Sequence, residues 1–194
     1  KLNSDFIFAY SPERINPGDK EKKLSGSKFY GLGSVAVSHD DKFLAYSVDL
    51  KGSEYYDIFV RNLLTAEIIE EKIKNTSGSI SWSLDSKSFF YTPLDKYHRS
   101  KKIYKHVLGT PFEQDKLIFE EKEEAFSVGI SLTSDEKFFI ISTSDSNTDE
   151  EYFFSTKEEE IKIQLFQSRL SILLIVGKDI GTCTPIKMPW IIKY

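Results

Sequence analysis

The chain has 194 residues, 40% of them hydrophobic and 14% aromatic, which is enough to supply the core of one ordinary domain. Its net charge of −4 disfavours nucleic-acid binding, because contacts to phosphates need clustered Lys and Arg side chains. The single cysteine, Cys183, excludes an intramolecular disulfide and provides no cysteine pair for a zinc site.

No segment reads as a signal peptide or a membrane span. The amino end lacks the apolar core of a signal peptide. The longest purely apolar run, residues 172–176, is far shorter than the roughly 20 residues that cross a bilayer. Together with the lone cysteine, these features predict a cytoplasmic protein without a membrane segment.

Residues 1–28 contain one apolar burst at residues 6–10, followed by repeated proline, glycine and lysine. Proline and glycine interrupt regular structure. The segment therefore predicts one remnant strand and a solvated linker.

Three copies of one short pattern follow, at residues 37–47, 82–92 and 132–142. Each copy has an apolar residue, a hydroxyl residue, any residue, Asp, any residue and Lys, and then an apolar run. The aspartates, Asp40, Asp85 and Asp135, are 45 and 50 residues apart. This spacing is close to the period of about 40 to 50 residues of a propeller blade.

Each copy predicts a hairpin. A Ser or Thr hydroxyl and an Asp carboxylate two residues later can both bond to the local backbone, which favours a tight turn. Lys42, Lys87 and Lys137 are then expected at the solvated tip. The aromatic and β-branched runs that follow are typical of short strands.

The sequence around these turns predicts an all-β fold: a partial β-propeller of about three four-stranded antiparallel blades, at about 29–76, 77–125 and 126–168. The strands are expected at 32–38, 43–49, 55–63 and 66–73, with a turn over 75–79, then at 79–83, 88–92, 102–108 and 116–121, and finally at 126–133, 137–143, 151–156 and 161–167.

After residue 168 the composition changes. Residues 161–194 hold five basic residues and one acid, together with Cys183, Met188 and Trp190, and no further copy of the turn pattern. We interpret residues 169–194 as an atypical tail. It is a different closing element, sequence read from a shifted frame from about Leu170, or a disordered segment.

Residues 94–110 resemble the amino-terminal propeller of the prolyl oligopeptidase family, and within it the oligopeptidase B (protease II) branch. Residues 31–38, 44–49 and 119–122 resemble the same family in the same order, so that the resemblance covers about residues 26–168. It implies a seven-bladed propeller over an α/β-hydrolase domain, whose Ser, Asp and His cleave short peptides after Lys or Arg. The propeller of that family carries no catalytic group and narrows the entrance, so that oligopeptides pass and folded proteins do not.

The hydrolase domain itself is not expected in this chain. A nucleophile elbow needs Gly-x-Ser-x-Gly, and no such pentapeptide occurs; Ser27 and Ser34 follow a glycine without the rest of the pattern. We interpret His39, His98 and His106 as surface or packing residues, because no activated nucleophile can be named beside them. The repeated aspartates are interpreted as turn residues. We therefore expect no catalytic, cofactor-binding or metal-binding residue.

Three hypotheses for function follow. The first is a substrate-gating fragment of an oligopeptidase B-like serine peptidase, inactive alone and complemented by a separately encoded α/β-hydrolase, with short basic peptides as the substrates of the complete enzyme. The second is an independent propeller that binds another protein through loops such as Tyr55-Tyr56 and Tyr97-His98-Arg99. The third is a split-gene product without a function.

Overall fold

The computed structural model describes residues 29–69, 72–157 and 160–171, and these residues form an all-β fold with no α-helix. The described elements are β1 (Gly31–Val37), β2 (Phe43–Asp49), β3 (Tyr56–Asn62), β4 (Ile73–Trp82), β5 (Ser88–Pro93), β6 (Lys102–Val107), the short 3-10 helix η2 (Phe112–Gln114), β7 (Lys116–Glu120), β8 (Ser127–Leu132), β9 (Phe138–Ser144), β10 (Thr148–Ser155) and β11 (Gln164–Ser171). None of them is a helix of the length and hydrophobicity needed to span a membrane.

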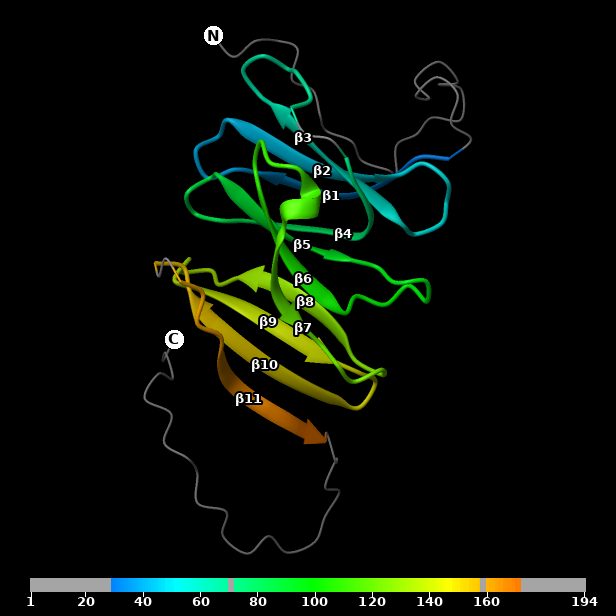
Figure 1. Cartoon of the computed structure of the whole chain (residues 1–194), viewed down its shortest axis with the longest axis vertical. Coiled ribbons are helices and arrows are strands. Elements are labelled where there is room, and N and C mark those ends of the chain that lie inside the picture. The colour runs from blue at the N-terminus through cyan, green and yellow to red at the C-terminus, as the bar shows by residue number, and fades with distance from the viewer. Residues whose placement is uncertain (1–28, 70–71, 158–159, 172–194) are drawn as a thin grey trace, which may run out of the picture.

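The strands pair with their neighbours in sequence, always antiparallel, as blades of a propeller do. One sheet holds β1 to β7 in order and a second holds β8 to β11. Three blades follow one another along the long axis of the molecule (Figure 1), with β1 to β3 at one end and β9 to β11 at the other. The predicted partial propeller is confirmed.

β4 belongs to two blades. Its first part pairs with β3, where Ile73 faces Ile58, and its last part pairs with β5, where Trp82 faces Phe89. Between the two parts, Asn75 and Gly78 have positive φ angles of 57° and 87°. These residue types tolerate the left-handed region, so the strand bends from one blade into the next without ending.

This arrangement corrects two predictions. The strand expected over 66–73 is wrong, because residues 66–69 form only an isolated bridge, between Ile68 and Arg61, and regular pairing begins at Ile73. The turn expected over 75–79 is a bent part of β4. Asn and Gly favour a left-handed backbone, which occurs both in turns and in bends within a strand. Only the pairing partners of the segment distinguish a bend from a turn.

The last strand is shifted along the chain. It was expected over 161–167, whereas β11 begins at Gln164 and pairs with β10 as far as Ser171, opposite Thr148. The part of the predicted tail from residue 172 onward, like residues 1–28, lies outside the described residues.

Two hydrophobic clusters hold the blades together. Strand side chains alternate between the two faces of a blade, so each face presents every second residue to its neighbour. The first cluster joins blades one and two and is made of Ala45, Ile58, Val60, Ile73, Trp82, Phe89 and Tyr91. The second joins blades two and three and is made of Phe90, Ile103, Val128, Phe139, Ile141 and Phe154.

Candidate functional site

The three repeated turns share one geometry. In each, the amide of the hydroxyl residue donates to the carbonyl five residues later at 2.9 Å, from Ser38 to Phe43, from Ser83 to Ser88 and from Thr133 to Phe138. The residue after each aspartate, which is Asp41, Ser86 or Glu136, has the same positive φ of 58°. The predicted hairpins are therefore confirmed, with their lysines exposed at the tips.

The carboxylate of each turn is held by the hydroxyl two residues before it. Ser38 Oγ donates to Asp40 Oδ1 at 2.8 Å, Thr133 Oγ1 donates to Asp135 Oδ1 at 2.7 Å, and Ser83 donates to Asp85 in the same way. These bonds, and then those from the following lysines, lower the pKa of Asp40 and of Asp135 from 3.8 to about 2.

Asp85 differs in its surroundings. Partial burial raises its pKa, but the hydroxyl of Ser83 and the amide of Lys87 outweigh burial, so the net shift is downward. All three turns thus keep an ionised carboxylate at neutral pH.

The turns contact one another across blades. The amide of Asp40 donates to Ser86 Oγ at 3.0 Å, which joins the first turn to the second. His39 Nδ1 lies 3.9 Å from Glu136 Oε1, which brings the first turn to the third. β1 also contacts β4, and β4 contacts β8, so the strands that lead into the three turns lie side by side.

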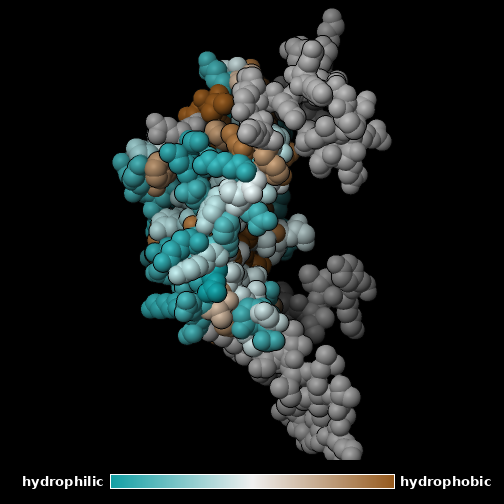
Figure 2. Space-filling model, turned by 90° about the vertical axis from the view of Figure 1, so that its right-hand side faces the viewer, coloured by the Kyte–Doolittle hydropathy of each residue, from teal (hydrophilic) through white to brown (hydrophobic). Residues whose placement is uncertain are grey.

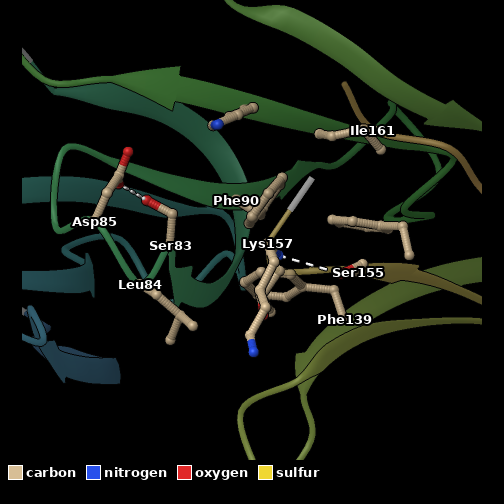
Figure 3. Close-up of a pocket in the computed structure, with 11 residues that line it drawn as sticks. Ser83, Leu84, Asp85, Phe90, Phe139, Ser155, Lys157 and Ile161 are labelled. Carbon is tan, nitrogen blue, oxygen red and sulfur yellow. Dashed lines mark hydrogen bonds between the residues drawn. The ribbon is translucent and has the colours of Figure 1, made fainter. Parts of the chain in front are cut away.

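A pocket opens beside the second turn, between blades two and three (Figure 3). Its volume is about 330 Å³. Ser83, Leu84 and Asp85 line one side and residues 155–157 the other, with Phe90, Phe139, Phe154, Ile161 and Lys105 completing the wall. The aromatic rings and Ile161 share this wall with hydroxyl and charged groups, among them Ser83, Asp85 and Lys105, so the pocket is more polar than a typical ligand cavity.

The three histidines lie in separate places. His39 is in the first turn near Glu136, and the ring of His98, in the loop before β6, lies 4.1 Å from the ring of Tyr55. His106 on β6 is buried, and its Nδ1 lies 2.8 Å from Asp115 Oδ1. Their partners agree with surface and packing roles, and the expectation that the chain has no catalytic residue stays a prediction.

Sequence reasoning missed two buried polar pairs. One is His106 with Asp115, and the other is Glu121 with Thr143, whose Oγ1 donates to Glu121 Oε2 at 2.8 Å. Alternation along β6 could have placed His106 facing inward, but no local signal points to Asp115 as its partner.

Metal ligands do not gather in the part of the chain that the structure describes: no group of three or more His, Cys, Asp or Glu side chains could hold an ion there. Cys183 lies outside the described residues. The expected absence of metals and cofactors from the whole chain stays a prediction.

Comparison with known proteins decides the family. Residues 19–178 match the family described as prolyl oligopeptidase, N-terminal beta-propeller domain. The chain belongs to the prolyl oligopeptidase family. The matched part includes all the described strands and extends beyond residues 26–168, over which the sequence resemblance was expected.

The relatives that this chain resembles include two proteins named as peptidases. Dipeptidyl aminopeptidase BI of Pseudoxanthomonas mexicana is 38% identical, over 61% of this chain and 16% of its own length. Protease 2 of Moraxella lacunata is 32% identical, over 69% of this chain and 20% of its own length.

Solved structures agree with this assignment. Oligopeptidase B from Leishmania major has a TM-score of 0.72 and 25% identity, covering 75% of this chain and 21% of its own. Oligopeptidase B from Trypanosoma brucei, with covalently bound antipain, has a TM-score of 0.68 and 28% identity, covering 75% and 20%. The chain thus spans about a fifth of the length of these relatives, and the residues that the structure describes lie within the match to the propeller domain.

Proposed function

We propose that this chain forms part of the substrate gate of an oligopeptidase B-like serine peptidase and requires an α/β-hydrolase domain for catalysis. The observation that carries the proposal is the match to the propeller domain over residues 19–178, together with the likeness to two oligopeptidase B structures. The complete enzyme would act on short peptides with Lys or Arg before the cleaved bond.

The three joined turns support a gating role. They come from three successive blades and contact one another through Asp40, Ser86, His39 and Glu136. Loops that are fixed to one another restrict the width of an opening better than loops that move independently, because widening it would break several contacts at once.

The first experiment tests whether the chain is inactive alone. The purified chain is incubated with a fluorogenic dipeptide that carries Arg at the cleaved bond, and no turnover is expected. A full-length oligopeptidase B serves as the positive control. Hydrolysis that a serine-directed reagent abolishes would show that the chain carries its own active site.

The second experiment tests the gate. Residues 29–171 replace the equivalent blades of an oligopeptidase B, and cleavage of the Arg dipeptide is compared with cleavage of a folded, Arg-containing protein. The chimera is expected to cleave the dipeptide and spare the protein. A second chimera, which lacks these blades, is expected to lose that discrimination. Equal discrimination by both chimeras would contradict the gating role.

A further inference from the structure

The pocket between blades two and three brings charges of both signs to one cavity. Asp85 comes from the second repeated turn, Lys105 from β6, and Lys157 from the segment that follows β10. The volume of about 330 Å³ is near the lower limit of ligand pockets, so it suits a single small molecule better than an extended chain. Hydrophobic residues are visible mainly at the first-blade end of the surface in Figure 2, whereas this pocket lies between the second and third blades.

The floor of the pocket is a packed group of aromatic rings. The ring centroids of Phe90 and Phe139 are 4.7 Å apart, and those of Phe139 and Phe154 are 5.2 Å apart. All three side chains are 2% exposed, so the floor is rigid, because closely packed rings leave little room for other rotamers. Leu84 and Ile161 lie on opposite sides of the Phe90 ring in Figure 3 and are only partly buried, which leaves apolar surface for a ligand to cover.

Two lysines give the pocket an excess of positive charge. Lys105 Nζ lies 5.8 Å from the centroid of the Phe90 ring, a cation–π contact that holds the ammonium over the floor. Burial raises the pKa of Asp85, two hydrogen bonds lower it, and the charge of Lys105 lowers it further, so this ammonium lies near that carboxylate. Neither Lys105 nor Lys157 forms an ion pair with another residue in the described part of the chain. Two positive charges and one negative charge favour a ligand that carries a carboxylate.

The carboxylate of Asp85 is fixed through one of its oxygens. Oδ1 accepts hydrogen bonds from the Ser83 hydroxyl and from the Lys87 amide, the latter at 2.9 Å. The described residues donate no hydrogen bond to Oδ2, so this oxygen is available to a ligand ammonium. The facing wall is fixed as well, because Thr156 Oγ1 donates to the carbonyl of Glu136 at 2.9 Å. Groups that are held in place before a ligand arrives lose less conformational entropy when it binds.

We propose that this pocket binds a free amino acid with an apolar side chain. The ligand ammonium contacts Asp85, and the ligand carboxylate contacts Lys105. The ligand side chain lies on the aromatic floor between Leu84 and Ile161. A zwitterion suits the pocket because an uncharged ligand would displace water from both charges without replacing its hydrogen bonds. The inference goes beyond the proposed gating function and does not depend on it.

Nuclear magnetic resonance of the nitrogen-15-labelled chain tests the binding, with L-phenylalanine as the probe. The amide peaks of residues 83–85 and 155–157 should shift on titration, with a dissociation constant of about 1 mM, as expected for a ligand of this size. N-acetyl-L-phenylalanine lacks the ammonium and phenethylamine lacks the carboxylate. Each should bind at least about tenfold more weakly, because each loses a charge-assisted hydrogen bond. These comparisons use the wild-type chain, so they do not depend on the folding of a variant.

Two variants assign the contacts. Asp85→Asn and Lys105→Met each remove one charge with little change in side-chain size, and each should weaken the binding of L-phenylalanine at least about tenfold. Asp135→Asn is the matched control, because Asp135 has the same position in the third turn but does not line the pocket, and it should leave the affinity unchanged. The dispersion of the peaks shows that each variant is folded.

Three outcomes would overturn the proposal. The first is a wild-type spectrum that does not change at about 10 mM L-phenylalanine, ten times the expected dissociation constant. The second is an analogue without one of the two charges that binds as tightly as L-phenylalanine. The third is a folded Asp85→Asn or Lys105→Met variant that keeps the affinity of the wild type.

Discussion

The imidazole Nδ1 of His106 lies 2.8 Å from Oδ1 of Asp115, and the two side chains are only 2% and 1% exposed. Asp115 also accepts a hydrogen bond of 2.8 Å from the Tyr91 hydroxyl through its second oxygen. Burial, and then Asp115, raise the pKa of Tyr91, so its hydroxyl remains a donor throughout the neutral range. Together these three side chains anchor the segment between β6 and β7 to the strands of the second blade. The ring of His106 also lies against the ring of Phe89.

Replacing Asp115 with Ala should destabilise the chain by about 2–4 kcal/mol, because two buried polar groups then lose their acceptor together. Tyr91→Phe removes one hydrogen bond and should cost about 1 kcal/mol. Urea unfolding followed by fluorescence gives both values. Equal losses for the two variants would mean that Asp115 matters only as the acceptor of the Tyr91 hydroxyl.

Acid should weaken the turns. Because the pKa values of Asp40 and Asp135 fall from 3.8 to about 2 on folding, the unfolded chain binds protons more readily than the folded one. Their contribution to stability is therefore complete above about pH 4 and is lost as the pH falls towards 2. Asp135→Asn should flatten the dependence of urea midpoints on pH within this window. A variant with the slope of the wild type would show that Asp135 does not contribute to it.

Ser86 joins two turns while its own backbone has a positive φ of 58°. Ser86→Ala removes the bond to the Asp40 amide and should cost about 0.5–1.5 kcal/mol. Ser86→Gly removes the same bond but relieves the left-handed backbone, so it should cost less than Ser86→Ala. Thermal unfolding of the two variants gives the comparison, and a glycine variant that is less stable than the alanine variant would contradict this account.

Phe90 should be among the most sensitive positions of the fold, because its ring is 2% exposed and contacts both Phe139 and Phe154. Phe90→Ala should cost about 3–5 kcal/mol through the cavity that it leaves between blades two and three. Tyr97→Ala is the matched control, because Tyr97 is 63% exposed and its loss should change stability by only about 0.5 kcal/mol. Similar unfolding midpoints for the two variants would argue against a packed interface at Phe90.

The sequence by itself determined the three turns and the strands that follow them. The hydrogen bonds that form each turn join residues no more than five positions apart, such as those from Ser38 and Thr133 to the aspartates two positions on. The local sequence therefore contains all the groups that the turn needs. Alternation of side chains likewise shows which residues share a face of a strand. The blade period and the family resemblance, both read from the same residues, agreed with the match to the propeller domain.

Only the tertiary structure decided how distant parts meet. It showed that residues 75–79 bend within β4, that Asp40 and Ser86 touch across 46 positions, and that His106 is paired with Asp115. It also showed that Asp85, Lys105 and Lys157 line one pocket. Local bonds select a turn or a strand, but the partner of a buried polar group or an apolar face is set by how whole sheets pack, because many weak contacts between distant residues fix that packing together.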